Sequence, residues 1–388
     1  MSYQSPGTPR FYIDTVQLLK NTGAAIEYSQ NNISANTIEV CEKLFNNNLR
    51  PDDPVIFDCE EGNLLTNTLT FENDKIISKL KEGNCYFALL NHNLFTASED
   101  VIFYPQFLKE DDSEYKPQAL EGINAEVDLT SDNRGSFKVK KDGFSIGTFN
   151  CDETEVDRFY FGIGKSGYGG LDTLSKFYIG GVSFGKYYDM PNSPDLDLTM
   201  KIENDGYRSI TTQGGKHINY VDYSGTPMWT HYIDRDGDVN DIIKLPAWAE
   251  PKRISPDFPN SVNRELVGMR RGRRVWSMNY KYFSEKNMFP SNFMSSNYME
   301  TSNGYDSSEY TENNNGINVF EHTINEHDSF ISQVLNKLGN GEKFIFQPNK
   351  NNSNDDQFAI CQINQKKINI KQEANGVYSI SLEIREVW

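Results

Sequence analysis

A mainly β protein is predicted for this chain of 388 residues, and three observations predict it. Apolar and polar residues alternate with a period of two in several stretches, as in strands with one buried face. Gly, Asn and Asp, the residues of tight turns, recur between these stretches. Helical periodicity is confined to two short segments. Regular short strands of this kind are typical of a β-sandwich or jelly roll.

The segment 195–211 has the clearest strand pattern. Its apolar positions alternate with Asp, Thr and Lys, and they are Leu196, Leu198, Met200 and Ile202. Asn204, Asp205 and Gly206 follow, and these residues tolerate the positive φ of a hairpin turn. We therefore predict a hairpin closed at 204–206, with the four apolar side chains on its buried face.

A second predicted hairpin closes the chain. Ile368 and Ile370 precede an Asn375-Gly376 turn, and the alternating apolar residues after it are Tyr378, Ile380, Leu382 and Ile384. The alternation runs almost to the C-terminus. We expect this last strand to lie inside a sheet, because a loose terminus would not need the pattern.

The two helical segments are 34–47 and 328–341. In the first, Ser34 or Asn36 could cap the first turn. In the second, apolar residues recur at helical spacing up to a glycine that ends the helix; they are Phe330, Val334, Leu338 and Gly339. Further strand-like runs fill the region from 54 to 188 and the stretch 343–348.

The acidic composition of the chain disfavours two classes of binding partner. The chain has 55 acidic and 38 basic residues, for a net charge of −17, so its field repels nucleic acid and anionic membranes. No apolar run is long enough to span a bilayer, and the N-terminal residues lack the pattern of a secretory signal. Five scattered cysteines without a C-x-x-C pair are interpreted as reduced core residues. We expect a protein made in a cytoplasm.

Four arginines lie within the five positions from 270 to 274. After them, one face of a predicted strand carries Trp276, Met278, Tyr280 and Tyr282. Arginine pairs well with carboxylates, which this chain has in excess. We predict that the cluster meets the acidic face of a neighbouring copy, ahead of a solvated loop or DNA contact. The predicted oligomer-interface residues are Arg270, Arg271, Arg273, Arg274, Trp276 and Trp388.

No catalytic, cofactor or metal residue is predicted. There is no G-x-S-x-G elbow, and His322 and His327 miss the spacing of a helical metal pair. The glycines of 162–167 match a dinucleotide-binding fingerprint, but a strand follows them instead of the helix that the fingerprint needs. We therefore interpret them as glycines of a loop or a β-bulge. The acidic run from Asp234 to Asp241 lacks the glycine and glutamate positions of a calcium loop, and calcium there stays an open question.

Exposed aromatic residues could stack on sugar rings, as they do in lectin-like sandwiches. The candidate glycan contacts are Tyr187, Tyr188, Tyr223 and Trp229.

Two stretches, 179–229 and 341–388, carry a family resemblance. "IGGVSFGKYYDMPNSPDLDLTM" with "GGKHINYVDYSGTPMW", and "GEKFIFQPNKNNSNDDQFAICQINQKKINIKQEANGVYSISLEIREVW", resemble virion tail proteins of tailed bacteriophages, especially phages of marine bacteria. In the same resemblance "PRFYIDTVQLLK" opens the chain, and "RRGRRVWSMNYKYFS" begins the C-terminal part.

The resemblance to distal-tail and baseplate proteins implies a small β-barrel that assembles into a ring, with an inserted jelly-roll sandwich. It implies a discontinuous barrel domain of residues 1–49 and 245–388, and a jelly-roll domain of residues 50–244. The implied function is that of a non-enzymatic structural subunit of the virion tail. The subunit would be made in the bacterial host cytoplasm and would assemble into a ring, of which a hexamer is one possible form. Other phage tail proteins would be its partners; a neck or capsid-associated position stays open.

A function of another class competes with this one. The jelly roll could be a carbohydrate-binding module that recognises a glycan of the host surface through the aromatic residues named above. A glycan-degrading enzyme on the same fold would need a matched acid and base, which the sequence does not offer.

Overall fold

The computed structural model describes residues 7–21, 26–31, 43–45, 55–57, 65–71, 83–97, 101–109, 114–115, 117–128, 135–151, 156–165, 177–203, 207–221, 228–233, 242–245, 269–270, 273–289, 329–339 and 341–387. These ranges form a mainly β protein with few short helices, which confirms the predicted fold class.

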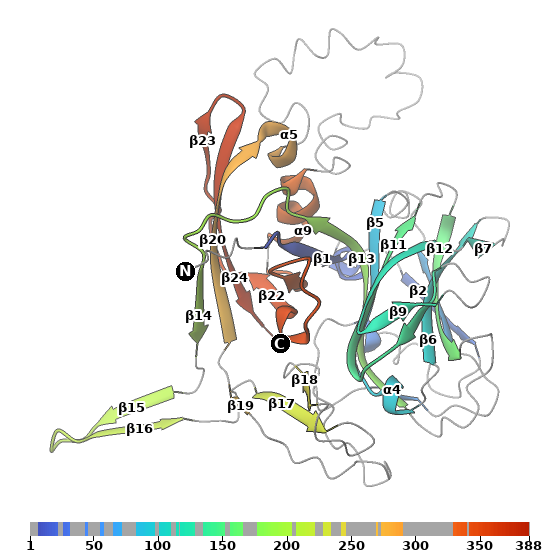
Figure 1. Cartoon of the computed structure of the whole chain (residues 1–388), viewed down its shortest axis with the longest axis horizontal. Helices are drawn as coiled ribbons and strands as arrows, with labels where there is room; N and C mark the ends of the chain where they lie inside the picture. The colour runs from blue at the N-terminus through green and yellow to red at the C-terminus, as the bar shows by residue number, and fades with distance from the viewer. Residues whose placement is uncertain are drawn as a thin grey trace.

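Two large antiparallel sheets make up most of the molecule (Figure 1). In spatial order the first contains β14 (Thr199–Glu203), β20 (Arg273–Ser284), β24 (Val377–Glu386), β22 (Ala359–Ile363), β21 (Phe344–Gln347), β1 (Arg10–Asp14), β13 (Phe177–Asp189), β5 (Gly83–His92), β11 (Gly143–Cys151) and β8 (Gln118–Ile123), with β23 (Ile370–Ala374) on β24 and β3 (Val55–Phe57) on β13. The second contains β2 (Ile26–Asn31), β4 (Leu65–Phe71), β12 (Val156–Lys165), β6 (Val101–Lys109), β10 (Phe137–Val139) and β9 (Ala125–Val127), with β7 (Glu114–Tyr115) on β6.

Smaller elements complete the described chain. Two minor sheets are β15 (Tyr207–Thr211) with β16 (His217–Val221), and β18 (Ile242–Leu245) with β17 (Met228–Ile233) and β19 (Met269–Arg270). The helical elements are α1 (Thr15–Asn21), α4 (Leu94–Ala97), α5 (Glu285–Met288), η3 (Ile331–Leu335), α9 (Asn336–Leu338) and η4 (Asp355–Gln357).

The second sheet packs face to face on the β13–β5–β11 part of the first and forms a β-sandwich (Figure 1). Its core is rich in phenylalanine, which buries a large apolar area per residue. The core rings include Phe87, Phe103, Phe107, Phe137, Phe149, Phe161 and Phe184.

The other end of the large sheet has its own core. Strands β1, β20, β21, β22 and β24 place apolar residues on one face, and α5, η3 and α9 contribute to covering it. Phe330, Val334 and Leu338 are buried there at the predicted helical spacing, and Gly339 follows the last helical residue. The helix expected within 328–341 is confirmed as a π-helical turn followed by α9. Most of the helix expected over 34–47 lies outside the described residues.

Strand β1 joins the two cores. It pairs with β13 of the sandwich on one side and with β21 on the other. Phe11 and Ile13 face the C-terminal core, whereas Tyr12 faces a third cluster formed with residues of β5, β11, β21 and β22. Because β1 and β5 are buried on both faces, the middle of each strand is a continuous apolar run, Phe11–Ile13 and Cys85–Leu90, rather than an alternating one.

Glycine is required where β1 and β13 approach each other. A Cβ on Gly185 would collide with the backbone carbonyl oxygen of Ile13 and lie 2.6 Å from Thr15 Oγ1. We expect Gly185→Ala to lower the free energy of unfolding by about 1 to 3 kcal/mol, since the backbone would have to shift. Gly214→Ala is the matched control because nothing lies within 4 Å of its added Cβ. Equal urea midpoints for the two variants would contradict the close approach.

The C-terminal hairpin is confirmed. β23 pairs with β24 around Gly376, whose φ is +67°, and β24 lies between β20 and β22 inside the sheet. The residues predicted to alternate inward, Tyr378, Ile380, Leu382 and Ile384, are all buried.

The hairpin predicted over 195–211 is wrong. β14 pairs with β20, and β15 pairs with β16, so the two strands flanking 204–206 have different partners. The four apolar residues of this segment are also exposed instead of buried. The turn residues permit a hairpin, but β20 offers β14 a longer partner strand that runs into the core.

The predicted face of β20 is correct at Trp276, Met278 and Tyr280, which are buried, and wrong at Tyr282. A β-bulge between Tyr280 and Phe283 shifts the register against β24. Tyr282 has a φ of +71° and is 74% exposed, and Phe283 takes the inward position.

The barrel component of the prediction is corrected. The strand order of the large sheet runs from β14 to β8 without closing, so it is open and not a closed barrel. The division into a 50–244 domain set between 1–49 and 245–388 stays a prediction. β1 pairs with β21 across the two terminal segments, while β14 and β2 pair across the predicted boundaries.

Candidate functional site

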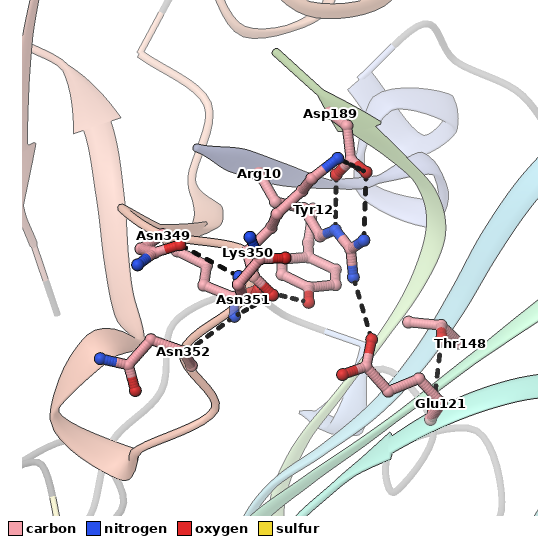
Figure 2. Close-up of polar contacts among 10 residues, drawn as sticks. Arg10, Tyr12, Glu121, Thr148, Asp189, Asn349, Lys350, Asn351 and Asn352 are labelled. Carbon is pink, nitrogen blue, oxygen red and sulfur yellow. Dashed lines mark hydrogen bonds and ion pairs between the residues drawn. The ribbon is translucent and has the colours of Figure 1, made fainter. Parts of the chain in front are cut away.

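A buried polar junction lies where β1 meets β13 and the loop after β21 (Figure 2). Arg10 begins β1 and Asp189 ends β13, and the antiparallel register places them directly opposite each other. Arg10 Nε donates to Asp189 Oδ1 at 2.6 Å, and Nη2 donates to Oδ2 at 3.1 Å. Lys350 Nζ reaches the same carboxylate at 3.2 Å. Two cations from the terminal segments therefore hold one carboxylate of the sandwich.

The Arg10 guanidinium has further neighbours. Its carbon lies 4.3 Å from the ring centroid of Tyr187, a cation–π distance. Its Nη1 lies 3.5 Å from Glu121 Oε2, which is an ion-pair distance but too long for a good hydrogen bond. Burial works to lower the pKa of Arg10, but the bond to Asp189 and the neighbouring Tyr12 together outweigh it, and the pKa is raised. Burial works to raise the pKa of Asp189, but Arg10 and Lys350 together outweigh it, and the pKa is lowered. Both groups stay charged.

Tyr12 connects this junction to the loop 348–352. Its hydroxyl donates to Gln347 Oε1 at 2.9 Å, and Gln347 Nε2 donates to the carbonyl oxygens of Lys350 at 3.4 Å and Asn352 at 3.0 Å (Figure 2). Burial raises the pKa of Tyr12 far above neutrality. The hydroxyl is therefore a fixed donor rather than an acid or base.

The junction is suited to hold strands in register. Arg10 and Asp189 do not change protonation near neutral pH, and each is engaged by a partner from a distant part of the chain. It resembles a structural clamp between two cores more than a reaction centre.

A second buried polar group surrounds His92 at the end of β5. Leu94 donates its backbone N–H to Nδ1 at 3.3 Å, so the ring proton lies on Nε2, which donates to Ser145 Oγ at 3.1 Å. Ser145 donates in turn to the carbonyl oxygen of Asn124 at 3.3 Å. Because no carboxylate bonds to Nδ1 and both side chains are fully buried, the pair is satisfied structurally and is not an activated nucleophile.

His92 predicts an acid-sensitive fold. Burial lowers its pKa from 6.5 to about 3, so the unfolded chain binds a proton in this interval that the folded chain does not. Stability is then full above pH 6.5 and is lost as the pH falls toward 3. From pH 7 to pH 5 the loss due to His92 is about 2 kcal/mol, at about 1.4 kcal/mol per pH unit.

His92→Asn keeps an acceptor near the Leu94 N–H and removes the titration. Urea unfolding at pH 7 and pH 5 checks the prediction. The free energy of unfolding of the variant should fall less than that of the wild type. Equal losses in both proteins would show that His92 does not titrate on unfolding.

The arginine cluster is divided between the interior and the surface. Arg274 is buried, with Nε 3.1 Å from Glu386 Oε2 and Nη2 3.2 Å from Oε1. Its backbone N–H donates to the same carboxylate at 3.0 Å, and Nη2 also donates to the carbonyl oxygen of Phe358 at 3.2 Å. The charge of Arg274 is thus compensated by Glu386 of its own chain. Arg273, beside it on β20, is partly exposed.

The other predicted interface residues have separate positions. Trp276 is buried in the C-terminal core, where its ring packs against Phe346. Arg270 belongs to β19, opposite Met228 of β17. Arg271 and Trp388 lie outside the described residues. The interface role of the cluster stays a prediction.

The candidate glycan residues are not gathered by the described chain. Tyr187 is half-buried under the Arg10 guanidinium, and Tyr188 packs on Phe330. Trp229 lies on β17, and Tyr223 and the acidic run from 234 to 241 fall outside the described ranges. The glycan and calcium predictions therefore stay open.

The described cysteines and the glycines of the fingerprint-like run lie in structural positions. Cys85, Cys151 and Cys361 are buried free thiols, as expected, and burial raises the pKa of Cys85 to about 12. Gly162 and Gly164 of the fingerprint-like run lie within β12, in agreement with a structural interpretation.

Within the ranges that the structure describes, no three His, Cys, Asp or Glu side chains gather as metal ligands would. The same ranges contain no helix with the length and apolar character needed to cross a bilayer. No protein-family model, curated protein or solved structure matches the chain.

Proposed function

We propose that this chain is a non-enzymatic structural subunit of a phage virion, in a ring at the tail tip or baseplate. One observation carries the proposal: a single sheet passes through two hydrophobic cores, and a buried clamp fixes the strands where they meet. A subunit built in this way would keep its shape along its length, as a building block of a ring must. The sequence resemblance to tail proteins supplies the setting.

The buried polar groups agree with this proposal. Arg10, Asp189 and His92 are each held by partners inside the chain, in arrangements that stabilise rather than react. The sandwich, which is consistent with the predicted jelly roll, would face outward from the ring.

Immunogold labelling of purified particles of the encoding phage tests the proposal. Antibody raised against the recombinant chain should label one end of the tail. An antibody against a known capsid protein is the positive control. If that antibody labels the particles and the antibody against this chain does not, the chain is not part of the virion. Labelling over the capsid alone would contradict the tail position.

A glycan array tests the competing function. A structural subunit gives no saccharide-specific signal, whereas a carbohydrate-binding module gives one that is lost when its aromatic contacts are replaced.

A further inference from the structure

Exposed apolar side chains are concentrated in one short part of the described chain. Eight large hydrophobic residues are exposed in the described chain as a whole, and six of them lie between positions 196 and 218. Four form what we call the β14 stripe: Leu196, Leu198, Met200 and Ile202. The other two, Ile210 and Ile218, lie on β15 and β16, which with the turn between them (residues 207–221) we call the arm.

The β14 stripe continues the C-terminal core to the margin of the large sheet. Met200 lies opposite Trp276 of β20, which is 4% exposed, yet Met200 itself is 53% exposed. β14 pairs with β20, and no described strand pairs with its other edge. An open edge beside an apolar face invites pairing with another chain.

The arm is a two-stranded hairpin that projects from the body (Figure 1). Neither strand pairs with any other described strand, and Ile210 faces Ile218 across the hairpin. An isolated hairpin of two strands is at best marginally stable in water. This one therefore needs a surface to cover its apolar pair.

The charges of the two regions are complementary. The arm contains Arg208 and Lys216 and no acidic residue, in a chain whose net charge is −17. Residues 195–203, which carry the β14 stripe, contain three acidic residues and one lysine. Asp195 and Glu203 are already paired with Lys281 and Arg385, whereas Asp197 accepts a hydrogen bond from the neutral amide of Asn279. Asp197 is therefore the carboxylate of this margin that a basic arm would meet.

We propose that the arm of one copy docks on the β14 stripe of the next copy. Both regions are exposed within a single chain, so neither covers the other. A head-to-tail contact between two different surfaces continues from copy to copy and closes into a ring when the rotation allows. The inference rests on the proposed ring function and names its contact: the arm and β14, rather than the arginine cluster.

Light scattering after size-exclusion chromatography measures the contact in solution. The full chain should form oligomers whose fraction rises with concentration. Ile210→Ser/Ile218→Ser should weaken association by at least about tenfold, since both apolar side chains lose their docking surface. Leu120→Ser is the matched control, because Leu120 is equally exposed on β8, outside both regions, and should change nothing. Circular dichroism should show all three proteins folded.

Cross-linking identifies the surfaces. Met200→Cys and Ile218→Cys are made separately, mixed, and treated with a short bis-maleimide. We expect an interchain product in the mixture beyond that given by either variant alone or by the wild type. A strong product from Ile218→Cys alone would indicate arm-to-arm contact and overturn the head-to-tail arrangement.

Two results would overturn the arm proposal in different ways. A chain that is monomeric at all accessible concentrations has no such contact. Oligomers that survive the arm substitutions unchanged use another surface, which would leave the virion proposal intact. Immunogold labelling decides that proposal independently.

Discussion

Replacing Arg274 by Met should lower the free energy of unfolding by about 3 to 5 kcal/mol, because it leaves the Glu386 carboxylate buried without a countercharge. Glu386 is 2% exposed and accepts from both the side chain and the backbone N–H of Arg274. Urea unfolding of the variant and the wild type at pH 7 measures this loss.

Arg385→Met is the control for this variant. Arg385 pairs with Glu203 at 2.8 Å, but both side chains are partly exposed, and such pairs contribute less than about 1 kcal/mol. Arg274→Met/Glu386→Gln should recover part of the lost stability, since no buried charge remains. If Arg274→Met unfolds like the wild type but fails to oligomerise, Arg274 acts between copies and the internal assignment is wrong.

Replacing Arg10 by Met should loosen the clamp between the two cores. We expect a loss of about 2 to 4 kcal/mol, less than for a fully buried pair, because Asp189 is 26% exposed and keeps Lys350. Without the Arg10–Asp189 bond, the strands that connect the two cores should also open more often. Hydrogen exchange should quicken in β1 and at the end of β13, where the bidentate bond holds the register.

Lys140→Met serves as the control for Arg10→Met. It removes a 2.7 Å pair with Glu126 on the surface of the sandwich, where both side chains are well exposed. Its effect should stay below about 1 kcal/mol. Equal effects of the two substitutions, or unchanged exchange in β1, would show that the junction does not clamp the sheet.

Strand identity was predictable wherever a strand has one wet face. β24 and most of β20 alternate strictly, and the alternation names their buried residues. The alternation gives the wrong face for Tyr282 because a β-bulge adds a residue to the strand. None of the residue types in 280–283 indicates a bulge. For strands buried on both faces, such as β5, the sequence indicates a strand but not its two separate cores.

The β14 segment shows what alternation cannot tell. Period-two patterning reports that one face of a strand is apolar, and it does not say what covers that face. In a single chain nothing described covers Met200 and Ile202, so the inference of burial was wrong for the monomer. A surface made to be buried against another copy has the same pattern as a core strand.

The junction could not be predicted because its parts are far apart in sequence. Arg10 and Asp189 are separated by 179 positions, and only the pairing of β1 with β13 brings them together. One weak signal existed: each is a charged residue at the end of an aromatic strand. The arginine cluster, by contrast, drew attention by density, yet Arg274 pairs inside its own chain.

Reconstruction of the intact phage tail by electron cryomicroscopy would show directly whether the chain assembles with its own copies through the arm and β14, as we propose. We expect a closed ring of this chain at the tail tip, with residues 207–221 of each copy lying along 196–202 of its neighbour. Single, unconnected copies, or a ring in which the arm and β14 both face solvent, would contradict it.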